Sequence, residues 1–141
     1  MSKIAVIYWS GTGNTAVMAD EIANGAKEAG ADVSVFSVDQ FSGSIKDYDK
    51  VAFGCSAMGD EVLEEAEFEP FFESIENNLS GKKIALFGSY GWGDGQWMRD
   101  WEERVNDKNA NLYDTGLMIN GMPDDEGKET CKNFGKGFVA F

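Results

Sequence analysis

The sequence predicts an α/β protein, a doubly wound five-stranded parallel sheet with helices on both faces, built by residues 1–141 as one domain. Short apolar runs alternate with helical patterns along the whole chain, which is typical of a parallel sheet. The first run is apolar on both faces, as expected of a buried parallel strand. Small and polar residues follow three of the runs, at the strand ends where such sheets bind ligands.

The first half of the chain predicts three strands and one helix. Ile, Val and Tyr indicate a strand over residues 3–9, and apolar residues spaced four apart predict a helix over residues 14–29. Gly30 is the expected stop of that helix. Apolar runs then predict strands over residues 32–38 and 50–54, and a long polar loop follows the second of them.

The second half predicts three helices and two more strands. Pro70 suits a helix start, which gives a helix over residues 70–79. Strands are expected over residues 83–89 and 111–119, with a helix over residues 96–105 between them. Acidic residues from Asp124 onward open the last helix, where carboxylates favour the positive end of the helix dipole.

Composition excludes several classes of function. The chain has 25 acidic and 12 basic residues and a net charge of −13, which argues against nucleic acid or an anionic membrane as partner. It has no histidine, which removes the commonest general base, the usual catalytic triads and most zinc or copper sites, so we expect no metal site. Two cysteines make no disulfide framework, and no apolar run resembles a secretory signal, so we expect a cytoplasmic protein.

The acidic residues are unevenly distributed. No basic residue occurs between Lys50 and Lys82, whereas eight acidic residues do. They are Asp60, Glu61, Glu64, Glu65, Glu67, Glu69, Glu73 and Glu76. Such a run either only keeps the protein soluble or steers a basic partner toward this region. A catalytic pair at Asp60 and Glu61 is the less favoured interpretation, since the run continues as a solvated acidic rim.

Residues 10–15, Ser-Gly-Thr-Gly-Asn-Thr, form the most informative motif. Three hydroxyls, one amide and two glycines lie at the start of a predicted helix, where backbone N–H groups and the helix dipole favour a phosphate. The glycine spacing also satisfies a dinucleotide fingerprint, with Asp39 as the ribose ligand. The many hydroxyls favour a terminal monophosphate instead. The preceding residue, Trp9, is given no ligand contact.

Two further loops carry side chains suited to a flat ligand. Trp92 lies between two glycines, outside any periodicity that would bury it, which favours stacking on a planar ring over a place in the core. Met58 is polarizable and can cover the other face of such a ring, with gap-filling in the core as the alternative. Gly59 permits backbone conformations that are closed to other residues. Cys55 and Cys131 are expected to be small buried residues.

With these three loops the sequence resembles the short-chain flavodoxins, along its whole length. The resemblance implies strand order 2-1-3-4-5 and a non-covalently bound FMN. It also implies that the phosphate is held by residues 10–15, that Ser56 and Ser89 lie near the ribityl and phosphate end, and that Met58 and Trp92 flank the isoalloxazine. The implied FMN-binding residues are Ser10, Gly11, Thr12, Gly13, Asn14, Thr15, Ser56, Ala57, Met58, Gly59, Asp60, Glu61, Ser89, Tyr90, Gly91, Trp92 and Gly93. Residues 120–123 match the family pattern least and receive no role.

The implied function is low-potential one-electron transfer, with the flavin cycling between semiquinone and hydroquinone. In the family, the peptide after the glycine equivalent to Gly59 reorients on one-electron reduction. We expect a monomer that docks redox-partner proteins transiently on its acidic flavin edge. The alternatives are a small FMN-dependent NAD(P)H or quinone reductase on the same fold, and a specialised activator of another enzyme.

Overall fold

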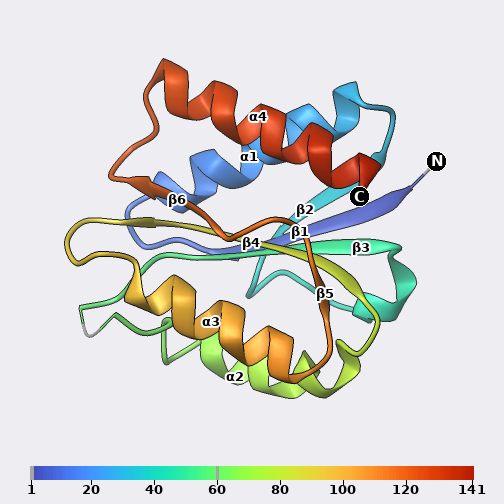
Figure 1. Cartoon of the computed structure of the whole chain (residues 1–141), viewed down its shortest axis with the longest axis horizontal. Helices are drawn as coiled ribbons and strands as arrows, with labels where there is room; N and C mark the ends of the chain where they lie inside the picture. Colours follow the sequence, from blue (N-terminus) through green and yellow to red (C-terminus); the bar gives the residue numbers. More distant parts are fainter. Residues whose placement is uncertain (1, 60) are drawn as a thin grey trace.

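A computed structural model describes residues 2–59 and 61–141 and contains three layers, a sheet between two pairs of helices (Figure 1). The strands are β1 (Lys3–Trp9), β2 (Asp32–Ser37), β3 (Lys50–Cys55), β4 (Lys83–Tyr90), β5 (Asn111–Leu112) and β6 (Leu117–Asn120). The helices are α1 (Asn14–Glu28), α2 (Phe68–Ile75), α3 (Gln96–Asp107) and α4 (Asp125–Ala140). Short 3-10 turns span Ile45–Asp47 and Glu76–Asn78. Within the described residues, no helix is long and apolar enough to cross a membrane.

The sheet has the order β2-β1-β3-β4-β5, and the strands pair in parallel, which confirms the predicted fold class and strand order. In the register of β1 and β3, Trp9 lies beside Cys55. In that of β3 and β4, Gly54 lies beside Phe87. The loops that follow these three strands therefore leave the same edge of the sheet next to one another.

The last predicted strand differs from the structure. Residues 111–119 form two short pieces, β5 and β6, which both pair with β4. Asp114, between them, has a left-handed φ of 53°, and the Gly116 N–H donates to Glu102 Oε2 at 2.6 Å instead of to a strand. This turn interrupts the pairing.

On one face of the sheet, α1 and α4 pack against each other through glycines. A Cβ at Gly25 would come within 2.0 Å of the Lys132 carbonyl oxygen, and a Cβ at Gly135 within 2.1 Å of the Ile22 carbonyl oxygen. The two helix backbones are therefore in direct contact at these glycines. Cys131 is buried in this layer, as predicted.

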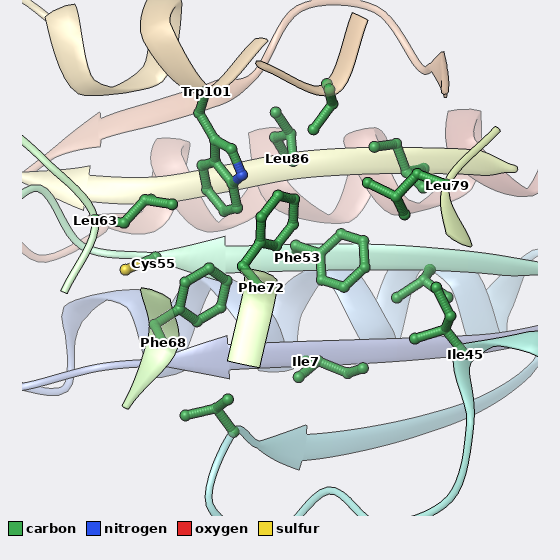
Figure 2. Close-up of a cluster of buried hydrophobic side chains, with 14 of the residues drawn as sticks. Ile7, Ile45, Phe53, Cys55, Leu63, Phe68, Phe72, Leu79, Leu86 and Trp101 are labelled. Carbon is green, nitrogen blue, oxygen red and sulfur yellow. The ribbon is translucent and has the colours of Figure 1, made fainter. Parts of the chain in front are cut away.

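The other face is packed by large aromatic rings under α2 and α3 (Figure 2). Phe68 and Phe72 are both in edge-to-face contact with Trp101, with ring centroids 5.5 and 5.7 Å apart. Trp97 is also buried, and its indole N–H donates to the Cys55 carbonyl at 3.2 Å. The Trp97 bond fixes α3 against the end of β3, where the second loop of the site begins.

Candidate cofactor site

The three predicted loops meet at one cleft on the carboxyl edge of the sheet. Its volume is about 390 Å³, within the range of pockets that hold small ligands. The lining residues are Trp9, Gly11, Thr12, Asn14, Ser56, Ala57, Met58, Gly59, Ser89, Tyr90 and Gly91. None of these described residues is a lysine or an arginine, so an anion here would be held by dipoles.

Several predicted residues do not line this cleft. Ser10 and Gly13 lie in the first loop, and Thr15 lies in the first turn of α1 behind it. Trp92, Gly93 and Glu61 lie in the neighbouring loops outside the cleft wall. Asp60 was also predicted, but it lies outside the described residues.

The first loop leaves the N-terminus of α1 open. Gly13 is the N-cap residue, with φ of 96°, and no side chain caps the helix. The first turn contains no acidic residue. The first N–H groups of a helix have no partner within it, so those of α1 are available to an anion. Ser10 Oγ accepts the Gly13 N–H at 3.1 Å, which leaves the Ser10 hydroxyl proton free.

A partly buried hydrogen-bond network connects the three loops behind this end of the cleft. Thr15 Oγ1 and Ser56 Oγ are 2.7 Å apart, and the Ser89 N–H donates to Thr15 Oγ1 at 3.2 Å. Each hydroxyl carries one proton, and one of the two is used between Thr15 and Ser56. The pair therefore keeps one proton to donate to a ligand.

The turn after β6, which was given no role, is part of the same framework. The Ser89 hydroxyl donates to the Gly121 carbonyl at 2.9 Å, and the Gly121 N–H donates to the Tyr90 carbonyl at 2.8 Å. Since its proton is used in this bond, Ser89 Oγ can only accept a hydrogen bond from a ligand and cannot donate one.

At the other end of the cleft, the second loop makes a tight turn at Met58. The Glu61 N–H donates to the Met58 carbonyl at 2.8 Å, and the Met58 N–H donates to the Val62 carbonyl at 3.1 Å. Glu61 has a left-handed φ of 53°. A Cβ at Gly59 would meet nothing within 4 Å, and its φ is not positive. This conformation of the turn therefore does not require a glycine.

The second and third loops touch through Glu61 and Gly93. A Cβ at Gly93 would lie 2.3 Å from Glu61 Oε1. That oxygen is buried, and no described residue donates to it. An unpaired buried acceptor is costly, so a donor from a ligand would stabilise it. Trp92, next to Gly93, is 65% exposed.

Trp9 is a lining residue that the sequence analysis did not assign. Its indole packs on the first loop, and a Cβ at Gly11 would come within 2.9 Å of the ring. The sequence does contain a signal for this role, because Trp9 is an aromatic residue at the last position of a strand, directly before a ligand loop.

The acidic run is less exposed than predicted, because Glu64 is buried. Its carboxylate accepts the N–H groups of Ala66, Glu67 and Phe68 at 2.7–2.9 Å and thereby caps the start of α2. Burial by itself raises the pKa of Glu64, but the three N–H donors outweigh it and the pKa is lowered. Glu64 is therefore a structural anchor of the second loop and does not belong to a solvated rim.

Two more acidic residues of the run form ion pairs with Arg104. Its guanidinium contacts Glu69 at 2.7 Å and Glu76 at 3.0 Å, and it lies 4.9 Å from the centre of the Phe72 ring. These contacts hold α3 against α2. Glu65, Glu67 and Glu73 remain exposed.

Cys55 ends β3 directly before the second loop and is buried, as predicted. Burial raises the pKa of its thiol to about 12, so the nucleophilic thiolate is absent at neutral pH. Among residues 2–59 and 61–141, no group of three or more metal-ligating side chains is found.

Comparisons with known proteins identify the family of the chain. The sequence profile of the flavodoxin family matches residues 6–135. The chain is 53% identical to a flavodoxin of Clostridium beijerinckii, over 93% of this chain and 95% of the relative. It is 46% identical to a flavodoxin of Megasphaera elsdenii, over 94% and 96% of the two chains.

Solved structures give the same result for the fold. The solution structure of two-electron reduced Megasphaera elsdenii flavodoxin superimposes with a TM-score of 0.85 and 42% identity, and 98% of this chain is covered and 99% of the other. The oxidised Flavodoxin 1 of Bacillus cereus gives a TM-score of 0.86 at 32% identity, over 99% and 98%. The chain belongs to the flavodoxin family. It is a small FMN-binding electron-transfer protein, not an enzyme that converts a substrate.

Proposed function

We propose that FMN occupies the cleft with its phosphate at the N-terminus of α1 and its ring between the second and third loops. The observation that carries this proposal is the coincidence of an uncapped helix start with a cleft bounded by all three loops. Bound FMN would supply the redox chemistry, and the protein supplies binding, orientation and electrostatics.

At the phosphate end, the residues present fit a dianion without a basic side chain. The free proton of Ser10, the hydroxyl of Thr12 and the amide of Asn14 are donors, together with the first N–H groups of α1. The pair of Thr15 and Ser56 provides one more proton. The missing positive charge leaves the phosphate charge largely in place.

At the ring end, Met58 lines the cleft and Trp92 stands exposed beside it. We assign them to the two faces of the isoalloxazine, which requires the Trp92 loop to close over the ring. Among the described residues, Glu61 Oε1 is a buried acceptor without a donor. We assign it to the imide N–H of the ring, which requires the second loop to bring this carboxylate into the cleft. Because the observed turn does not require a glycine, we assign the need for Gly59 to the reoriented peptide that the resemblance implies.

The same arrangement favours low reduction potentials. Adding negative charge to a ring near Glu61 and an unneutralised phosphate is unfavourable, most of all in a site shielded from water. We further propose that the protein acts as a cytoplasmic monomer and docks basic redox partners on the acidic side of the flavin edge.

Titration of the apoprotein with FMN and with riboflavin tests this placement. We expect a yellow complex and weaker binding of riboflavin, which lacks the phosphate. A protein that binds neither flavin, or both equally, would contradict the proposed site. Steady turnover of NAD(P)H by the FMN complex would instead favour the reductase alternative.

A further inference from the structure

Large apolar side chains that remain exposed are concentrated near the cleft. In the described part of the chain they are Val62, Trp92, Met118, Met122 and Phe141, with exposed fractions from 37% to 65%. Trp92 and Met122 follow β4 and β6 directly in the sequence, Met118 lies within β6, and Val62 lies in the loop between β3 and α2. Exposed apolar groups gathered from separate segments mark a binding surface more often than single ones do.

The two methionines flank the loop that carries Trp92. Met118 Sδ lies so close to Gly95 that a Cβ there would come within 2.6 Å of it. Met122 follows Gly121, whose N–H donates to the Tyr90 carbonyl at the other end of the loop. Figure 1 shows β6 beside β4 at the end of the molecule where this loop turns. We call Met118 and Met122, which border the Trp92 loop, the methionine edge.

The surroundings of the methionine edge are acidic. Asp94 in the loop has a side chain that is 77% exposed, and Arg99 is its ion-pair partner at 3.0 Å. Asp124, Asp125 and Glu126, which start α4 just after Met122, are exposed as well. In the acidic run, Glu64, Glu69 and Glu76 are engaged within the protein, whereas Glu65, Glu67 and Glu73 are exposed.

We propose that the methionine edge is the centre of the docking surface for a redox-partner protein, whose matching face has an apolar centre ringed by lysine or arginine. This inference rests on the proposed electron-transfer site and says which side of it the partner covers. An apolar centre enriched in aromatic residues and methionine, with a charged rim, is the usual anatomy of a protein interface. The acidic rim makes a basic partner the complementary one.

Methionine also suits a carrier that serves more than one partner. Its side chain is unbranched and polarizable, so it adapts to surfaces of different shape. A small interface of this kind gives short-lived complexes, as in other redox encounters. Tyr90 and Gly91 of the same loop line the cleft, so a partner on the methionine edge lies next to the cofactor.

Electron transfer to a basic cytochrome c, used as a probe, tests the proposal. One electron passes from the reduced FMN protein to the ferric haem, which becomes ferrous. We expect M118Q/M122Q to lower the second-order rate constant at least about fivefold, the change that corresponds to about 1 kcal/mol. M118L/M122L keeps the apolar area and should retain the wild-type rate. FMN affinity and the rate with benzoquinone, a small acceptor, should stay unchanged in both.

A second variant distinguishes docking on the methionine edge from docking on the acidic run. E65Q/E67Q/E73Q removes exposed charges of the acidic run and should mainly reduce the dependence of the rate on salt. If this variant slows the cytochrome reaction while M118Q/M122Q does not, the docking centre lies on the acidic run and the proposal is wrong. Failure of the wild-type protein to bind FMN or reduce benzoquinone would instead refute the proposed function.

Discussion

The two ends of the cleft are built in opposite ways. At the phosphate end, Thr15 is completely buried and bonded to both Ser56 and Ser89. At the ring end, Trp92 is 65% exposed and a side chain at Gly59 would meet nothing. One end is fixed before any ligand arrives, whereas the other retains room to move.

This difference separates two tasks. A preorganised set of donors gives affinity, because little order has to be gained on binding. Loops with open space can adopt a second arrangement, which is what a cofactor with several charge states requires. On the proposed function, changes at the phosphate end should therefore alter binding of FMN over riboflavin, and changes at the ring end should alter reduction.

The largest effect is expected from T15V. It removes the donor shared with Ser56 and leaves the Ser89 N–H without its acceptor. Leaving the buried Ser89 N–H unpaired costs about 1–3 kcal/mol, and Ser56 loses the partner that orients its hydroxyl toward the phosphate, so FMN should bind roughly 10–100-fold more weakly. Riboflavin affinity should change far less. T130V, which removes an exposed hydroxyl on α4, is the matched control, and equal losses for both flavins would contradict the division of tasks.

W92A should act on both flavins alike, because it removes a stacking ring and no phosphate contact. We expect about tenfold weaker binding, in line with the energy of aromatic contacts and the apolar area they cover. The potential of the second one-electron step should rise, measured by titration with a redox dye. W92F keeps an aromatic ring, so its flavin affinity and its second reduction potential should lie between those of W92A and the wild type. Unchanged affinity and potential in W92A would place Trp92 outside the stack.

E64Q tests the carboxylate that anchors the second loop at the start of α2. The lowered pKa of Glu64 means that its carboxylate stabilises the fold above pH about 4.5, the usual glutamate pKa. That contribution is lost as the pH falls below this value toward the lower folded-state pKa. Urea unfolding should show E64Q destabilised by about 1–3 kcal/mol at pH 7, with a smaller difference at low pH. E65Q, at an exposed neighbour, should match wild type, and a constant difference at all pH values would reject the pKa argument.

The smallest effect on binding is expected from G59A. Since a Cβ there meets no atom, FMN affinity should stay within about twofold. Alanine nevertheless restricts the backbone, so a smaller fraction of the one-electron-reduced protein should accumulate during stepwise reduction. If G59A accumulates the same fraction of one-electron-reduced protein as the wild type, the peptide does not need a glycine in either arrangement.

The parts of the site that follow from local patterns were predictable. Residues 10–15 mark a phosphate loop by their own chemistry, and strand ends placed them beside Ser56 and Ser89. The role of Glu64 was not predictable in this way, because its donors come from a turn that exists only once α2 is docked. Likewise, Arg104 is one basic residue in the sequence, and only packing brings it between Glu69 and Glu76.

The division of the last strand was missed for a related reason. Residues 111–119 are apolar enough for one strand, but the Gly116 N–H has a better acceptor in Glu102, on α3. Hydrophobic pattern predicts that a segment is extended, whereas competition between distant acceptors decides where its pairing stops.

The close contact of α1 and α4 gives the molecule a mechanical property. Gly25 lies 11 positions after Asn14, roughly 16 Å along the axis of α1. Because backbone touches backbone at Gly25 and Gly135, a methyl group added at either position must displace α1 as a rigid body. The N-terminal end of α1 adjoins the phosphate loop. A substitution remote from the cleft can thus misalign its donors without touching any of them.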